Sequence, residues 1–97
     1  MKHVLENEKL TIFLEGELNS FTSEDVEREI DEILKSNKFN AVVIDLKDVK
    51  YVSSAGIRIM IRIRRQCEDT SLVNVPKNIF DVFEMVGLPN LINIQKL

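Results

Sequence analysis

Hydrophobic and polar residues alternate along the first part of the chain. Residues 2–6 and 9–15 have the two-residue period of β-strands. The pair Asn7 and Glu8 between them suits a tight turn. We therefore predict a hairpin whose second strand ends at Gly16.

The apolar positions then change to helical spacing. Residues 23–36 carry apolar side chains three and four positions apart, with charged side chains on the opposite side, which predicts an amphipathic helix. Thr22 or Ser23 can cap its first turn. The β-branched run at 41–46 is typical of a strand that is covered on both faces by helices. Asp48 then predicts a turn.

Residues 57–65 fit two patterns. Four isoleucines alternate with Met60 and arginines, so periodicity alone slightly favours a strand. The same residues form a broad apolar arc on a helix, with Arg58, Arg62 and Arg65 gathered on a narrow one. Two serines that can cap a helix precede the segment, and a buried parallel strand needs a crossover after it. We therefore predict a helix whose arginines form a solvated face, which could instead attract an acidic partner surface.

The last third of the chain repeats the strand and helix signals. Residues 71–75 predict a short strand, and an apolar helix face follows at 79–86 and stops at Gly87. A final short strand is indicated by Leu91, Ile92 and Ile94. The predicted order is ββαβαβα with a possible terminal strand, which corresponds to a small α/β fold with helices packed on a sheet. We expect one domain that spans residues 1–97.

Composition narrows the range of functions. Hydrophobic residues make up 44% and charged residues 30% of the chain, which is ordinary for a globular domain. The net charge is −3 with acidic and basic residues interleaved, so the sequence lacks the concentrated basic face that a nucleic acid would need. The longest apolar run is too short to span a bilayer, so we expect no membrane insertion. A protein is the default partner.

Single copies of histidine and cysteine limit the chemistry. A catalytic serine would have to recruit His3, the only histidine, from the N-terminal end of the chain. Since no metal ligands cluster either, we expect no cofactor, no metal site and no enzymatic activity. Cys67 cannot form an internal disulfide and is typical of a small buried hydrophobic residue. Because no signal peptide precedes the first strand, we expect a cytoplasmic protein.

The tetrad Ser53-Ser54-Ala55-Gly56 lies where a buried strand should end and a helix begin. The first N–H groups of a helix lack internal partners and carry partial positive charge, so they accept an anion such as a phosphate on serine. The plainer interpretation is a helix cap and a tight turn, with Gly56 needed for close packing. The tetrad is therefore a candidate switch and not a candidate active site.

Three segments of the sequence resemble one family. The run at 43–57 looks like the signature of STAS domains. Residues 16–19, Gly-Glu-Leu-Asn, are similar to the Gly-x-Leu-Asp loop of that family, and residues 83–88 resemble the end of its third helix. The resemblance covers almost the whole chain in order. It implies a STAS-like α/β domain, with a mixed, mainly parallel sheet of four to five strands and helices packed on it.

Standalone STAS domains are the bacterial anti-sigma factor antagonists. The resemblance implies that the unphosphorylated chain binds an anti-sigma factor, which is also a serine kinase, and is released when that kinase phosphorylates Ser54. Ser53 is the second choice for the phosphate. The residues implied to bind the partner are Asn19, Thr22, Ser53, Ala55, Gly56 and Arg58. We expect the free protein to be a monomer.

The chain departs from the family pattern at two positions. Ser53 and Asn19 stand where the family often has aspartate, so both departures remove negative charge near the proposed site. They leave open an alternative, a constitutive scaffold subunit of a sensory or lipid-transport assembly that is not phosphorylated. An ordinary loop-and-cap role for Asn19 and Thr22 also stays open.

Overall fold

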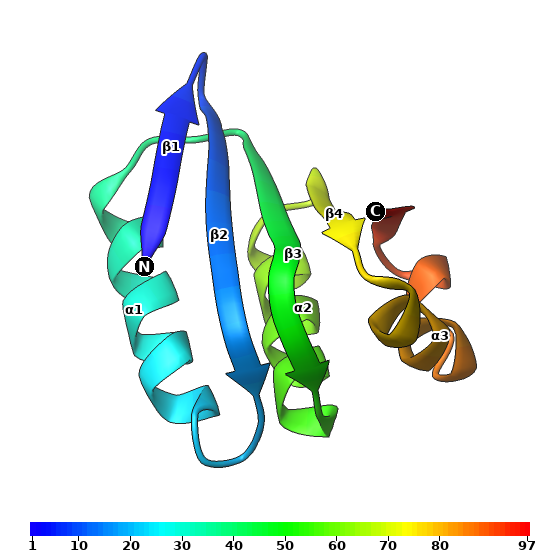
Figure 1. Cartoon of the computed structure of the whole chain (residues 1–97). Coiled ribbons are helices and arrows are strands. Elements are labelled where there is room, and N and C mark those ends of the chain that lie inside the picture. The colour runs from blue at the N-terminus through cyan, green and yellow to red at the C-terminus, as the bar shows by residue number, and fades with distance from the viewer.

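The structure, a computed structural model that describes residues 1–97, contains five strands and three α-helices (Figure 1). Their bounds are β1 Lys2–Glu6, β2 Lys9–Leu18, α1 Ser23–Ser36, β3 Ala41–Val52, α2 Ser54–Gln66, β4 Thr70–Val75, α3 Lys77–Met85 and β5 Asn93–Lys96. The strands form one sheet in sequence order, in which β1 is antiparallel to β2 and all other neighbours are parallel. The predicted hairpin, the helix over 23–36 and the mixed, mainly parallel sheet are confirmed.

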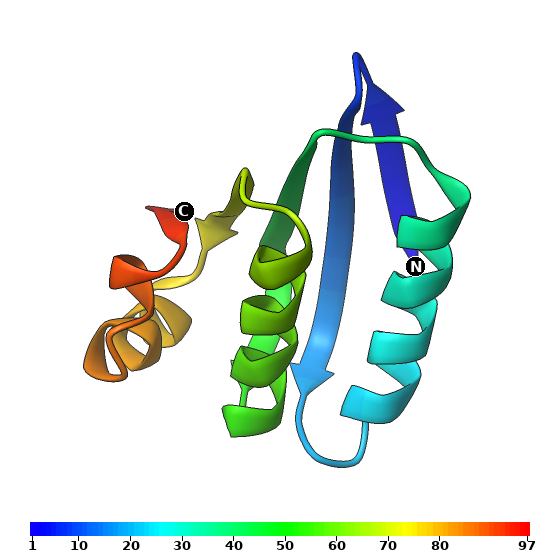
Figure 2. The same ribbon diagram turned by 180° about the vertical axis from the view of Figure 1, so that it is seen from behind.

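The helices α1 and α2 cover the same face of the sheet, as Figures 1 and 2 show from opposite sides. Right-handed crossovers that advance in one direction along a sheet place their helices on one face. The core forms there, from alternate residues of the strands such as Ile12, Ile44 and Leu72. The prediction that 41–46 is covered on both faces is wrong, because its other residues, including Val43, remain half-buried on the second face.

Two other boundary predictions are wrong for one reason. Gly16 does not end β2, and Asp48 does not form a turn, because both lie inside strands that continue to Leu18 and Val52. The pairing of β2 with β3 contains two β-bulges, which bend the strands without ending the ladder. Gly16 takes φ 79° beside one bulge, a conformation that glycine adopts without strain.

Residues 54–66 are helical, so the predicted helix over 57–65 is confirmed and the strand alternative is wrong. The four isoleucines can all face the core from a helix. Ile59 and Ile63 are buried, and Ile57 and Ile61 pack against the margin of the core cluster. A strand would have sent the arginines to one face of the sheet, whereas the helix keeps them away from the core.

The C-terminal elements follow the prediction with shifted ends. The helix α3 ends at Met85, and Gly87 takes the left-handed conformation (φ 76°) before a 3-10 turn at Leu88–Asn90. The last strand, β5, begins only at Asn93 and lies parallel to β4. Cys67 is buried in the core cluster, as predicted. None of the helices combines the length and the apolar composition that a membrane-spanning segment requires.

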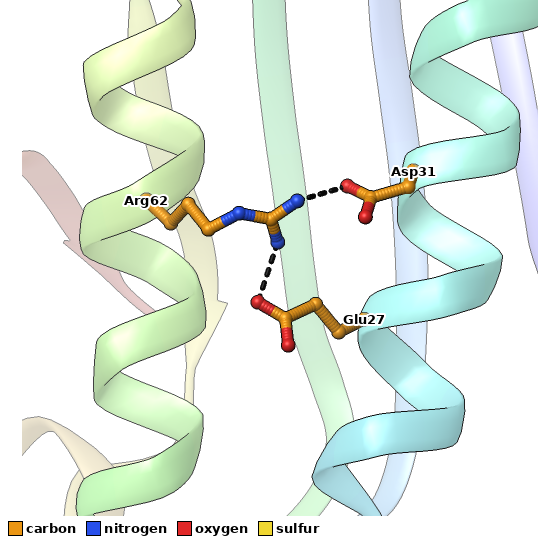
Figure 3. A network of polar contacts seen from close by, with 3 residues as sticks. All are labelled: Glu27, Asp31 and Arg62. Atoms are coloured by element: carbon orange, nitrogen blue, oxygen red, sulfur yellow. Dashed lines mark hydrogen bonds and ion pairs between the residues drawn. The ribbon is translucent and has the colours of Figure 1, made fainter.

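An ion-pair network joins the two helices that cover the sheet. Arg62 of α2 donates hydrogen bonds to Glu27 and Asp31 of α1 (Figure 3). The prediction that Arg62 belongs to a solvated face is therefore wrong. The hydrogen bond to Asp31 raises the pKa of the Arg62 guanidinium further above its ordinary value, against the opposing effect of desolvation. Arg62 thus remains cationic wherever the protein is folded.

We expect Arg62→Met to lower the free energy of unfolding by about 1 kcal/mol, because one guanidinium makes two partly exposed ion pairs. Urea unfolding at low ionic strength measures the change. The loss should shrink in high salt, since salt screens exposed charges. Arg58→Met, on the same helix but without an ion pair, is the matched control and should change stability by less than about 0.5 kcal/mol. Equal losses for the two variants would contradict the assignment.

Candidate functional site

Two segments meet at the carboxyl edge of the parallel strands. The loop from β2 to α1 and the junction from β3 to α2 lie at the same end of the sheet (Figure 1). They are joined through the backbone, because Leu18 pairs with Val52 and the Ser53 N–H donates to the Leu18 carbonyl oxygen at 2.8 Å. Ligands and partners of open α/β sheets commonly bind at this edge.

The two serines of the junction have different surroundings. Ser53 is the N-cap of α2, and its hydroxyl oxygen accepts a hydrogen bond from the Ala55 N–H at 3.2 Å. Ser53 is half-buried, whereas Ser54, the first helical residue, is exposed. The hydroxyl of Ser53 therefore caps the helix, and Ser54 remains accessible to another protein.

Gly56 sets how closely α2 approaches the sheet. A Cβ at this position would lie 2.8 Å from Val52 Cγ1 and 2.9 Å from Leu18 Cβ. Both distances are shorter than real Cβ contacts, so a larger residue would push the helix start away from the strands. Ala55 is buried as well. The two small residues of the tetrad thus lie inside the molecule, and any effect they have on a partner is transmitted through the position of α2.

The β2–α1 loop is held by side chains that bond to its own backbone. The Asn19 Oδ1 accepts from the N–H groups of Phe21 at 2.8 Å and of Thr22 at 3.1 Å. The Thr22 hydroxyl donates to the Glu17 carbonyl oxygen at 2.7 Å and accepts from the Asn19 N–H at 3.0 Å. Thr22 occupies the N-cap position of α1, but its side chain makes no cap hydrogen bond, so the prediction of a side-chain cap by Thr22 is wrong.

One exposed aromatic residue of this loop was not predicted. Phe21 is 92% exposed, the largest exposure among the exposed large hydrophobic residues of the chain. Its backbone is fixed by the hydrogen bond to Asn19. The sequence signal was available, because Phe21 stands among polar residues outside the apolar spacing of the strand before it and of the helix after it. Aromatic residues on ordered surface loops are common anchors of protein interfaces.

The charge around Ser54 is basic on the helix side. The first turn of α2 contains no acidic residue, and Arg58 is exposed four residues after Ser54, on the same helix face. Arg62 is engaged by α1 and does not contribute a free charge. No group of three or more His, Cys, Asp or Glu side chains is placed to hold a metal ion. The edge combines an accessible hydroxyl, a cation and an aromatic ring, which suits the binding of a protein surface.

Comparisons with known proteins identify the family and the fold of the chain. The sequence model of the STAS domain family matches residues 2–96. A Thermotoga maritima protein assigned as an anti-sigma factor antagonist is 17% identical, with a TM-score of 0.86 over 99% of this chain and 86% of that one. Among curated proteins, none matches the chain significantly.

The Bacillus anti-sigma factor antagonist SpoIIAA shares the fold in two states. The unphosphorylated form is 21% identical, with a TM-score of 0.73 over 96% of this chain and 87% of that one. The phosphorylated form has the same identity, with a TM-score of 0.65 over 96% of this chain and 90% of that one.

We expect Gly56→Ala to lower the free energy of unfolding by about 2 kcal/mol, because its Cβ would overlap Val52 and Leu18. The loss should appear although alanine is the better helix former. Urea unfolding measures it. Ser54→Ala, two residues earlier and exposed, is the matched control and should stay within about 0.5 kcal/mol of the parent. A stable Gly56→Ala protein would show that α2 does not need this close approach.

Proposed function

The chain belongs to the STAS domain family, and we propose that it is an anti-sigma factor antagonist switched by phosphorylation of Ser54. In this proposal the unphosphorylated protein binds an anti-sigma factor that is also a serine kinase, which frees a sigma factor. Phosphorylation of Ser54 by that kinase then separates the two proteins. The observation that carries the proposal is the exposed hydroxyl at the first residue of α2, on an edge that two ordered segments complete.

The local geometry favours Ser54 over Ser53 as the phosphate acceptor. A kinase must reach the hydroxyl, and Ser54 is exposed while Ser53 is half-buried. Phosphorylation of Ser53 would also turn its Oγ, which accepts from the Ala55 N–H, into the bridging oxygen of a phosphate ester, a weaker acceptor. Losing such a cap costs a helix about 1 kcal/mol. Modification of Ser54 costs the fold no hydrogen bond of its own side chain.

The fold can carry a phosphate at this place without rearrangement. The group would lie at the positive end of the helix dipole, with Arg58 one turn further along. The phosphorylated form of SpoIIAA retains the same overall fold, which supports this view. The switch then acts on the interface, because the phosphate adds about 1.5 to 2 negative charges to a surface that the partner covers. A loss of only about 1.4 kcal/mol weakens binding tenfold.

The loop supplies the second half of the proposed interface. Asn19 and Thr22 hold its backbone, and Phe21 extends from it into solvent. The amide oxygen of Asn19 accepts the two hydrogen bonds that an aspartate carboxylate would also accept. We infer that Asn19 preserves the shape of this loop and lowers its negative charge. Asn19, Thr22, Ser53, Ala55 and Gly56 would then position the surface, and Ser54, Arg58 and Phe21 would contact the partner.

The proposal includes a binding role without catalysis, in the cytoplasm where sigma factors act. A constitutive scaffold role is the second candidate, because Ser53 and Asn19 replace residues that are often acidic in the family. The two roles differ in one property, the response of partner binding to charge at Ser54. The scaffold would bind its partner equally well with and without that charge.

We expect the anti-sigma factor kinase that this proposal requires as partner, incubated with the chain and ATP, to place one phosphate on Ser54. Peptide mass spectrometry locates the phosphate. Ser53→Ala should still be modified, since its hydroxyl is not the acceptor, whereas Ser54→Ala should not. A phosphate found on Ser53, or none under conditions where a known antagonist and kinase pair reacts, would contradict the switch.

Binding of the same kinase by calorimetry separates the two candidate roles. Ser54→Ala should retain the affinity of the parent and remain bound in the presence of ATP. Ser54→Asp should bind at least about tenfold more weakly, because it places a charge inside the interface. Equal affinities for Ser54→Asp and the parent would favour the constitutive scaffold.

A further inference from the structure

The first strand leaves one edge of the sheet open. All five residues of β1 are exposed, and β1 pairs with β2 alone (Figure 1). Val4 and Leu5 are 37% and 40% exposed, respectively. An open edge presents main-chain N–H and C=O groups that can pair with a further strand.

The hairpin turn determines which main-chain groups are free. Asn7 and Glu8 have φ of 52° and 65°, as in a two-residue type I′ turn, so the flanking pair Glu6 and Lys9 is hydrogen-bonded. Hydrogen-bonded positions alternate along an antiparallel pair. Lys2, Val4 and Glu6 therefore direct their main-chain groups toward β2. His3 and Leu5 direct theirs away from the sheet.

We propose that β1 pairs antiparallel with β1 of a second copy, about a two-fold axis at Val4. In this register His3 of each copy lies opposite Leu5 of the other, which completes four main-chain hydrogen bonds. Val4 lies opposite Val4. Lys2 lies opposite Glu6 of the second copy, and Glu6 opposite Lys2, so both charge pairs are complementary.

The charges select this register among the symmetric ones. If the two-fold axis passed through His3 or Leu5 instead, Lys2 of one copy would no longer lie opposite Glu6 of the other. Lys2, Val4 and Glu6 occupy the non-hydrogen-bonded positions of the new pair, where opposite side chains approach most closely. Lys2 lies over the ring of its pairing partner Phe13, with its Nζ 5.4 Å from the ring centroid. Phe13 alternates with the buried residues Ile12 and Leu14, so both side chains lie on the face opposite the core.

The pairing goes beyond the proposed switch. A two-fold axis reverses strand direction, so the carboxyl edges of the two copies point in opposite directions and both Ser54 hydroxyls stay accessible. Such a dimer presents two sites for a partner protein. Because a five-residue edge buries far less than a standard interface, we expect a dissociation constant on the order of 0.1 to 1 mM. The chain is then a monomer at low concentration and pairs where many copies are held together.

Two charge reversals test the pairing with the protein alone. In a dimer of Lys2→Glu, position 2 and position 6 of the other copy are both acidic, and in a dimer of Glu6→Lys both are basic. Because like charges then face each other, each variant should self-associate about tenfold more weakly than the parent. When the two variants are mixed, a dimer with one copy of each again places an acidic residue opposite a basic one at both pairs. The readout is the NMR shift of the His3 and Leu5 amides, from about 20 µM to about 1 mM protein.

We expect the parent amides to shift with concentration, each variant alone to shift little, and the equimolar mixture to regain the shift. Lys38→Glu, an exposed lysine outside β1, is the matched control; it should self-associate like the parent and give no gain when mixed with Lys2→Glu. Recovery in the mixture also shows that neither variant has lost β1, since an unfolded strand would not pair. The proposal is overturned if the parent shows no shift, if the single variants associate like the parent, or if the mixture fails to recover.

Discussion

The close packing of the first turn of α2 on the ends of β2 and β3 is the contact on which the rest of the site depends. It is possible because Gly56 has no side chain, so that Leu18 and Val52 can lie against the helix backbone. The hydrogen bond from Ser53 to Leu18 fixes the same contact from the other side. Because α2 starts there, its first residue, Ser54, is exposed to solvent.

That contact also ties two distant segments into one surface. Leu18 is the last residue of β2, so the loop that follows it begins directly beside the start of α2. The side chains of Asn19 and Thr22 then hold the loop against its own backbone. In the proposed switch, the accessible hydroxyl of Ser54 would carry the added charge. The rest of the tetrad is used for packing or capping, so the fold would stay intact.

The helices cover only one face of the sheet, and this arrangement leaves the molecule with two further surfaces. Residues on the second face of the sheet, such as Val43, are half-buried, and the β1 edge is open. The ion pairs of Arg62 with Glu27 and Asp31 fasten α1 to α2 across the covered face. The edge that carries Ser54, the open face and the open strand are therefore separate surfaces of the chain.

The sequence by itself determined the features that depend on neighbours along the chain. The periods of the strands and helices, the serine cap before α2 and the left-handed Gly87 follow from local rules, and they predicted the order of elements. Pairing and exposure depend on residues far away in the sequence. Only the tertiary structure showed that β2 continues past Gly16 and that Arg62 bonds to α1. It alone also showed that Phe21 is exposed and that Ser54 is more exposed than Ser53.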